Sequence, residues 1–195
     1  MSFRNRMAVW LLVMPAWAGG PVTLGLSIGE ESDNLPVAVL SAMKAETGRI
    51  LKPAGVQIRW SDTVDLSREA PNRLVLVRLV GVSSAGVALR GAEGVLAVTH
   101  MSDGRILPFV DMDVQRVARV IERFGVVGRA QEYGRALGRV LAHELYHVLS
   151  GSVEHDSEGV AKSALNGVEL VRSELSLSEG ACRRIREALG LMGTP

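Results

Sequence analysis

The chain has 195 residues, of which 47% are hydrophobic and 22% are charged, which is enough for one domain with a full core. Its 22 Lys and Arg residues nearly balance its 21 Asp and Glu residues, so the formal net charge is +1. That balance gives no electrostatic case for a nucleic-acid partner or an anionic membrane surface. Cys182 is the only cysteine, which excludes an internal disulfide bond and a cysteine-based zinc cage.

The first eighteen residues have the pattern of a secretory signal peptide. A short basic start with Arg4 and Arg6 precedes the apolar run 7–17, and Ala16 and Ala18 are small residues of the kind that signal peptidase reads. The run is too short to cross a bilayer as a helix. The sequence therefore predicts a signal peptide over residues 1–18, and a secreted or periplasmic protein without a membrane anchor after cleavage.

The next part of the chain predicts strands around one helix. Apolar residues alternate over 22–28 and 56–60, as in half-buried strands. Segment 74–80 is almost wholly apolar, which is typical of a central strand. Between the first two strands, apolar side chains at helical spacing predict a helix that opens at Pro36 and ends near residue 51. The intervening polar or glycine-containing segments are predicted loops: 61–73 and 81–94.

Two further strands are predicted as a hairpin, at 95–98 and 106–110. The dipeptide Asp103-Gly104 between them suits a tight turn. Pro108 has no N–H to donate to a neighbouring strand, so the hairpin is expected at or near an edge of the sheet.

The remaining elements are predicted helices. Asp113 caps a helix whose apolar stripe runs to Phe124, and a second helix covers 129–149 and ends at Gly151. Ser176 and Glu179 form a predicted capping box for the last helix. This order of elements predicts an α+β (mixed α/β) fold, with a twisted mixed sheet packed on two or more helices. Small residues in the 129–149 helix, which let a neighbour approach closely, include Gly134 and Gly138.

The chemistry of this sequence is concentrated in the 129–149 helix. His143 and His147 are four residues apart, so one helical turn places both imidazoles on the same face, where they can hold one Zn²⁺ ion. Zinc lowers the pKa of a bound water to about 7. Glu144 lies one step round the helix, so it can take a proton from that water without binding the metal. We therefore predict His143 and His147 as metal ligands and Glu144 as the catalytic base.

A catalytic zinc site needs a third protein ligand, and the sequence offers several. Gly151 lets the chain reverse after the helix, so His155, eight residues past His147, can return to the ion. Glu169 or Glu174, from a later segment, is the alternative third ligand. The remaining histidine, His100, is interpreted as a surface or loop residue.

Other polar residues near the site have less specific interpretations. The acidic residues around His155 are read as a solvated loop, or as acceptors for an imidazole N–H; they are Glu154, Asp156 and Glu158. Tyr146 and Tyr133 are interpreted as packing residues. The arginines of the last helix are read as its solvated face; they are Arg183, Arg184 and Arg186.

The histidine helix, the glycine turn and the third histidine together resemble the zincin metallopeptidases, and among them the metzincins. The segment is also similar to small secreted bacterial zincin-like proteins. In metzincins the gap between the second and third histidines is usually six residues, whereas here it is eight, and Ala161 stands where a methionine is expected. The resemblance implies a single domain over 19–195, with an upper sheet–helix subdomain (19–151) and a small C-terminal subdomain (152–195).

The functional hypothesis is a secreted zinc metallopeptidase that holds one Zn²⁺ ion with His143, His147 and His155. Glu144 acts as general base and later donates the proton to the leaving amine. A peptide or protein substrate is expected to lie along an edge strand, here assigned to 95–98. Two alternatives stay open: a secreted zinc-binding module without catalysis, and a zinc hydrolase of a non-peptide amide. The oligomeric state is not predicted.

Overall fold

The protein is described by a computed structural model that covers residues 22–29, 34–61, 72–81, 94–126, 129–172 and 174–192. The predicted signal peptide at 1–18 lies outside these residues, as do most of the predicted loops at 61–73 and 81–94. Among the residues covered, no helix has both the length and the apolar character needed to cross a bilayer.

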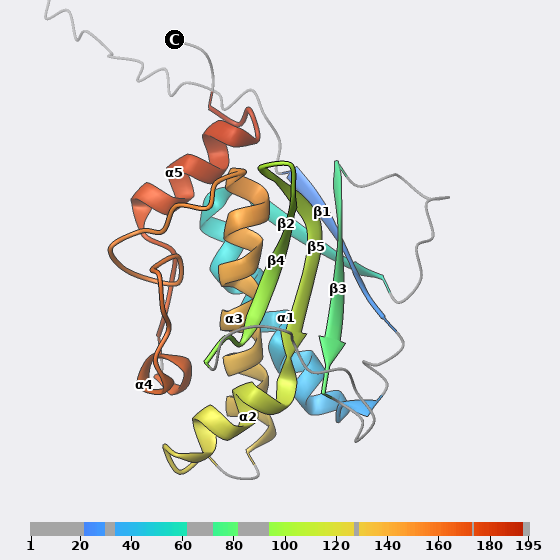
Figure 1. The fold of residues 1–195 in the computed structure, drawn as a ribbon, viewed down its shortest axis with the longest axis vertical. Helices are drawn as coiled ribbons and strands as arrows, with labels where there is room; N and C mark the ends of the chain where they lie inside the picture. Colours follow the sequence, from blue (N-terminus) through green and yellow to red (C-terminus); the bar gives the residue numbers. More distant parts are fainter. Residues whose placement is uncertain are drawn as a thin grey trace, which may run out of the picture.

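A five-stranded sheet forms one layer of the fold (Figure 1). The strands are β1 (Val22–Ile28), β2 (Val56–Ser61), β3 (Arg73–Val80), β4 (Ala97–Ser102) and β5 (Arg105–Asp113). Their order across the sheet is β2-β1-β3-β5-β4, and β4 is antiparallel to β5 while the other neighbours are parallel. The prediction of a central strand at 74–80 is confirmed, and so is the placement of the β4–β5 hairpin at an edge.

Helices pack on one side of this sheet (Figure 1). They are α1 (Val37–Leu51), the short 3₁₀ turn η2 (Lys52–Ala54), α2 (Val114–Glu122), α3 (Ala130–Ser150), α4 (Gly167–Val171) and α5 (Glu179–Ala188). α3 contacts β4 and β5, and α1 contacts β2. The mixed content of strands and helices fits the predicted α+β class.

One set of alternate side chains of the strands builds the core against the helices, although β1 is buried at every residue from 24 to 28. Leu24 and Leu26 of β1, Val75 and Val77 of β3, and Val110 of β5 are all buried in one apolar cluster with residues of α1 and α3. This burial of apolar surface holds the sheet and the helices together, and so fixes α3 beside the β4 edge.

α1 and α3 approach closely because α3 lacks side chains at the contact. A Cβ atom at Gly134 would lie 2.4 Å from the carbonyl oxygen of Val39 and 2.5 Å from Cβ of Ala42. One turn later, a Cβ atom at Gly138 would lie 2.8 Å from the carbonyl oxygen of Met43. The expectation that small residues permit a close neighbour is confirmed at these two positions.

We expect Gly134→Ala to destabilise the fold, because the added methyl group would push against the backbone of α1. The loss should be about 1–3 kcal/mol, the usual cost of overpacking a tight core. Gly48→Ala is the matched control, since it also places alanine inside a helix but its Cβ meets nothing within 4 Å. Gly48→Ala should therefore raise the free energy of unfolding by about 0.5–1 kcal/mol. Urea denaturation of both variants measures the difference, and equal effects would contradict the close-contact argument.

Several predicted boundaries are wrong. β4 begins at Ala97, two residues after the predicted strand start, and continues to Ser102. α2 ends at Glu122, so Phe124 lies beyond the helix with 46% of its surface exposed. The cap of α5 is Ser178, whose hydroxyl accepts from the N–H of Ala181, whereas the carbonyl of Ser176 accepts from Val160. The sequence also gave no prediction of α4, a five-residue helix with its own capping box.

Candidate metal centre

The helix α3 places two imidazoles side by side near its C-terminal end. His143 and His147 have ring centroids 4.9 Å apart, and their Nε2 atoms are 3.3 Å apart. α3 extends to Ser150 and ends where Gly151 adopts a left-handed conformation with φ of 64°, as the sequence predicts. The end of the helix therefore comes one turn after His147, and the chain can fold back over the histidine face.

The segments after α3 hold both rings by their other nitrogens. Nδ1 of His143 lies 2.8 Å from the carbonyl oxygen of Val160, and Nδ1 of His147 lies 2.8 Å from that of Ser152. A carbonyl oxygen only accepts, so each Nδ1 carries the proton and donates. The Nε2 lone pairs are thereby left free and face each other, which is the arrangement of two metal-binding imidazoles.

The loop after Gly151 brings a third imidazole to the same place. The ring of His155 is centred 5.3 Å from that of His143 and 4.8 Å from that of His147. One nitrogen from each of the three rings lies within 4.8 Å of the other two. Three nitrogen donors at this separation fit a divalent transition metal such as zinc, although the geometry does not single out zinc from other metals that favour imidazole.

The environment of the cluster favours neutral imidazoles. Burial lowers the pKa of His147, against the opposing effect of its hydrogen bond to Ser152. The pKa of His155 is also lowered. The main cause is the partial desolvation of its ring, and the second is the charge of the nearby His147. Since a metal ion binds the neutral form, both shifts support binding near neutral pH.

Glu144 reaches toward the edge of the sheet and lines a cavity together with the three histidines. Only 8% of its surface is exposed, and the hydroxyl of Thr99 on β4 donates to its Oε2 at 2.7 Å. The same hydroxyl lies 3.2 Å from the backbone carbonyl of Glu144. The carboxylate is thus held between α3 and β4. Thr99 was missed by the sequence analysis, because nothing local marks a threonine 45 residues upstream as a partner of Glu144.

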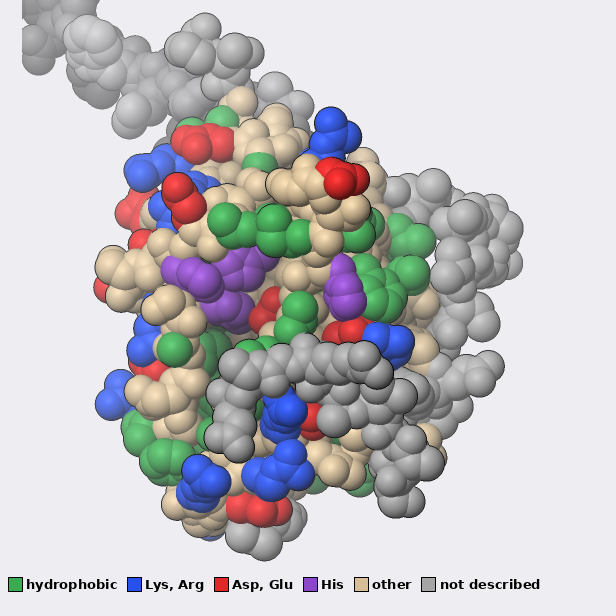
Figure 2. All heavy atoms as spheres, in the orientation of Figure 1, with side chains coloured by type: hydrophobic (Ala, Val, Ile, Leu, Met, Phe, Trp, Pro, Cys, Tyr) green, Lys and Arg blue, Asp and Glu red, His purple; other side chains and the backbone are tan. Residues whose placement is uncertain are grey.

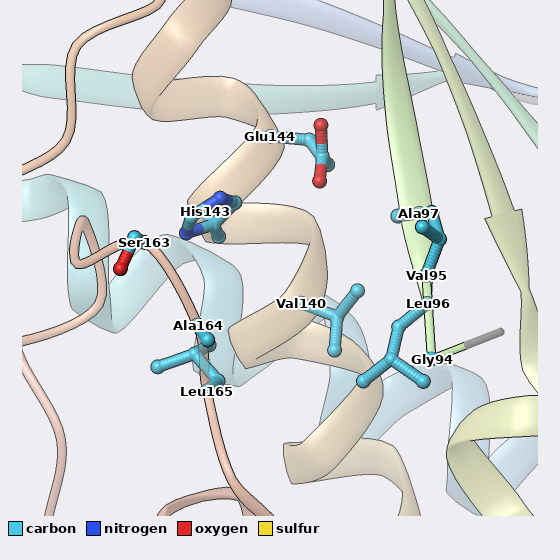
Figure 3. A pocket seen from close by; sticks show the side chains of 10 residues that line it. All are labelled: Gly94, Val95, Leu96, Ala97, Val140, His143, Glu144, Ser163, Ala164 and Leu165. Atoms are coloured by element: carbon cyan, nitrogen blue, oxygen red, sulfur yellow. The ribbon is translucent and has the colours of Figure 1, made fainter. Parts of the chain in front are cut away.

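Two cavities open beside Glu144, between β4 and the segments after α3. One has a volume of about 260 Å³ and is lined by His143 and Glu144 and by apolar side chains that include Val95, Leu96 and Leu165 (Figure 3). The other, of about 290 Å³, adjoins all three histidines of the cluster. In the space-filling view, histidine side chains gather in a purple patch on the same face as a hollow (Figure 2). The cluster is therefore accessible to a molecule that lies along β4.

The two alternative third ligands, Glu169 and Glu174, make other contacts or lie outside this cluster. Glu169 pairs with Lys162 and completes the capping box of α4 with Asn166. Glu174 lines a separate groove near Arg49. Among the residues covered by the structure, neither glutamate belongs to the group that could hold an ion together.

His100 lies on β4 but outside the cluster. It is half-buried, and its Nε2 is 3.0 Å from Oδ2 of Asp111, which also pairs with Arg78. Its side chain is 38% exposed, as predicted for a surface residue, but it lies within β4 because this strand runs on past Val98.

Two predictions about the polar residues around the site are wrong. Asp156 is neither a solvated loop residue nor an acceptor for an imidazole, because it pairs with Arg184 at 2.9 Å. Arg184 accordingly does not belong to the solvated face of α5. The Nδ1–H groups of His143 and His147 instead donate to backbone carbonyls, which no side-chain pattern could indicate. Tyr146 is fully buried, as its interpretation as a packing residue requires.

In comparisons with known proteins, no family model matches the chain, and no curated protein gives a significant match. The resemblance to zincins therefore rests on the residues of the motif and stays a prediction.

Proposed function

We propose that this chain is an exported zinc-dependent peptidase, with His143, His147 and His155 as the metal ligands and Glu144 as the catalytic base. The observation that carries the proposal is the convergence of three imidazole nitrogens within 4.8 Å, next to a carboxylate held in place by β4. Without the third imidazole, the helical pair would be an ordinary feature of an amphipathic helix.

The residues fit a catalytic zinc site in their number and type. Three imidazole ligands would leave a fourth position for water or substrate, which is the composition of catalytic rather than structural zinc sites. When bound, zinc supplies a Lewis acid that polarises a carbonyl oxygen and acidifies a water molecule. Backbone acceptors at Nδ1 of His143 and His147 fix the orientation of both rings and favour the tautomer whose Nε2 can bind a metal.

Glu144 supplies the proton transfers. As a carboxylate it takes a proton from the attacking water, and it then donates that proton to the amine that leaves. The hydroxyl of Thr99 binds one carboxylate oxygen at 2.7 Å and leaves the other to carry the proton. The side chain therefore needs little rearrangement between the two transfers.

The edge of the sheet suggests the substrate class. β4 is the last strand in the sheet order, so one of its sides is free of another described strand. An extended peptide can add to such an edge by backbone hydrogen bonds, while its side chains enter the neighbouring cavities. The cavity lined by Val95, Leu96 and Leu165 offers an apolar lining beside Glu144. These features favour a peptide or protein over a small non-peptide amide.

The test is digestion of a broad peptide library by the purified chain. We expect cleavage that is lost with a chelator and regained when zinc is returned. His147→Ala is the control, and it should lose both stoichiometric zinc by elemental analysis and the cleavage. Stoichiometric zinc with no cleavage of any peptide would contradict the peptidase and favour the zinc-binding module. Full zinc retention by His147→Ala would contradict the assigned centre itself.

A further inference from the structure

The loop that carries His155 is tied down by the residue that follows it. Oδ1 of Asp156 accepts from the backbone N–H of Ser157 at 2.9 Å, and its Oδ2 accepts from the hydroxyl of Ser178, the cap of α5. The backbone N–H of Asp156 donates to the carbonyl of Ala161 at 2.8 Å. The carboxylate therefore points away from the three histidines and toward the C-terminal helix.

Arg184 on α5 contacts the chain neighbours of two of the histidines, Asp156 and Tyr146. Its Nη2 lies 2.9 Å from Oδ2 of Asp156, and its Nε donates to the phenol oxygen of Tyr146 at 2.9 Å. The buried Nη2 has no aligned hydrogen-bond acceptor among the residues that the structure covers, so its contact with Asp156 is an attraction between charges. One guanidinium thus joins the loop to α3.

Tyr146, the second partner of Arg184, lies next to His147 on α3. Tyr146 is fully buried, it precedes His147 in the chain, and the two rings are 5.3 Å apart at an angle of 61°. A continuous set of contacts therefore runs from His155 through Asp156, Arg184 and Tyr146 to His147.

We propose that Arg184 is a positioning residue for the metal centre: it holds the His155 loop against α3, so that the third imidazole is in place before the ion binds. The inference rests on the metal centre of the proposed function but not on peptide hydrolysis. His155 itself is exposed, and its loop follows a helix end where the chain would otherwise sample many conformations. Fixing it in advance removes an ordering cost from metal binding. α5 is accordingly part of the metal centre, although it supplies no ligand.

The experiment is a double-mutant cycle on affinity for Zn²⁺, measured on the full chain by competition with a chromophoric chelator. The four proteins are the parent, Arg184→Met, His155→Ala and the double variant. We expect Arg184→Met to weaken zinc binding about 10-fold, the lower end of the range for direct partners of metal ligands, because Arg184 acts through neighbours of the ligands. In the His155→Ala background the same change should have less than about a twofold effect, because the ligand through which Arg184 acts is gone.

A spectroscopic measurement separates positioning from a general loss of structure. The visible spectrum of bound Co²⁺ reports its ligands, and in Arg184→Met it should shift toward the spectrum of His155→Ala. Arg183→Met is the matched control, since Arg183 is 59% exposed on the same helix and lies 3.9 Å from Glu187. This control should bind zinc and cobalt like the parent.

Three outcomes would overturn the proposal. Unchanged affinity of Arg184→Met would do so, and an equal loss in both backgrounds would assign Arg184 a general structural role instead. A parent that binds neither metal would remove the centre altogether. Absence of peptide cleavage alone leaves the inference standing, because it is measured without turnover. Should Arg184→Met fail to fold, Tyr146→Phe removes only the phenol oxygen, and it should then weaken zinc binding in the parent background and not in His155→Ala.

Discussion

Replacement of Glu144 by glutamine should slow hydrolysis strongly while the metal stays bound. Glutamine keeps the shape of the side chain and can still accept the hydrogen bond from Thr99, but it cannot take a proton from water. Loss of a general base lowers the rate of a reaction about 10²- to 10⁴-fold. We therefore expect the turnover number for a cleavable peptide to fall by that factor, with unchanged zinc content by elemental analysis.

The same chemical change at Glu158 is the control for this variant. Glu158 is an exposed carboxylate in the loop that follows α3, and it lines a different groove from Glu144. Glu158→Gln should leave both turnover and zinc content as in the parent. Cleavage by Glu144→Gln at the parental rate would remove the assigned base from the mechanism.

A second large effect is expected at Glu46, on α1. Its carboxylate is 6% exposed and pairs with Arg139 at 2.8 Å and with Arg49 at 2.8 Å, and the side chain of Arg139 is fully buried. Carbonyl oxygens of Glu169 and Leu170 also accept from Arg139, but they carry no charge. Glu46 is thus the buried counter-charge that links α1 to α3.

Glu46→Ala should lower the free energy of unfolding by about 3–5 kcal/mol, because it leaves a buried guanidinium without its carboxylate. Chemical denaturation at neutral pH measures this. Ser41→Ala, on an exposed position of the same helix, is the control and should change stability by no more than about 0.5 kcal/mol. A loss at Glu46 no larger than at Ser41 would show that the pair does not matter for the fold.

The stability of this pair should also depend on pH in a defined direction. Burial raises the pKa of Glu46, but the hydrogen bonds and charges of Arg49 and Arg139 outweigh it and hold the pKa below its ordinary 4.5. Because the folded pKa is the lower one, the stabilisation is complete above about 4.5 and is lost as the pH falls through the folded value. In the Glu46→Ala protein this part of the acid sensitivity should be missing.

Several features of the fold could be predicted because they depend on neighbours in the chain. Alternation over 22–28 identified β1 with its observed bounds, and the Asp103-Gly104 turn has positive φ at both residues, as its composition predicts. The spacing of His143 and His147 already implied that their rings would meet, since helical geometry alone brings residues four apart together. Local propensity failed where two signals competed, as at the N-terminus of α5, where Ser176 and Ser178 could each cap.

The candidate metal centre could be predicted only in part. His155 was a candidate beside Glu169 and Glu174, and sequence spacing could not decide among them, because a loop after a helix can return in many directions. Tertiary contacts favour His155. The contacts of Val160, Ser152 and Asp156 hold the loop over α3. Glu169 instead pairs with Lys162 and caps α4. The roles of Thr99 and Arg184 could not be predicted, because a threonine in a strand and an arginine in an amphipathic helix are common and have no distinctive sequence pattern.

The sequence by itself determined the α+β class, the helical pair of imidazoles with its adjacent carboxylate, and the glycine at which the helix ends, because each follows from periodicity or spacing within a few residues. Only the tertiary structure decided which further group joins the pair, what holds Glu144, and what anchors the loop. Those contacts join segments from 8 to 45 residues apart. They form because the burial of apolar side chains between α1, α3 and the sheet fixes where each backbone runs.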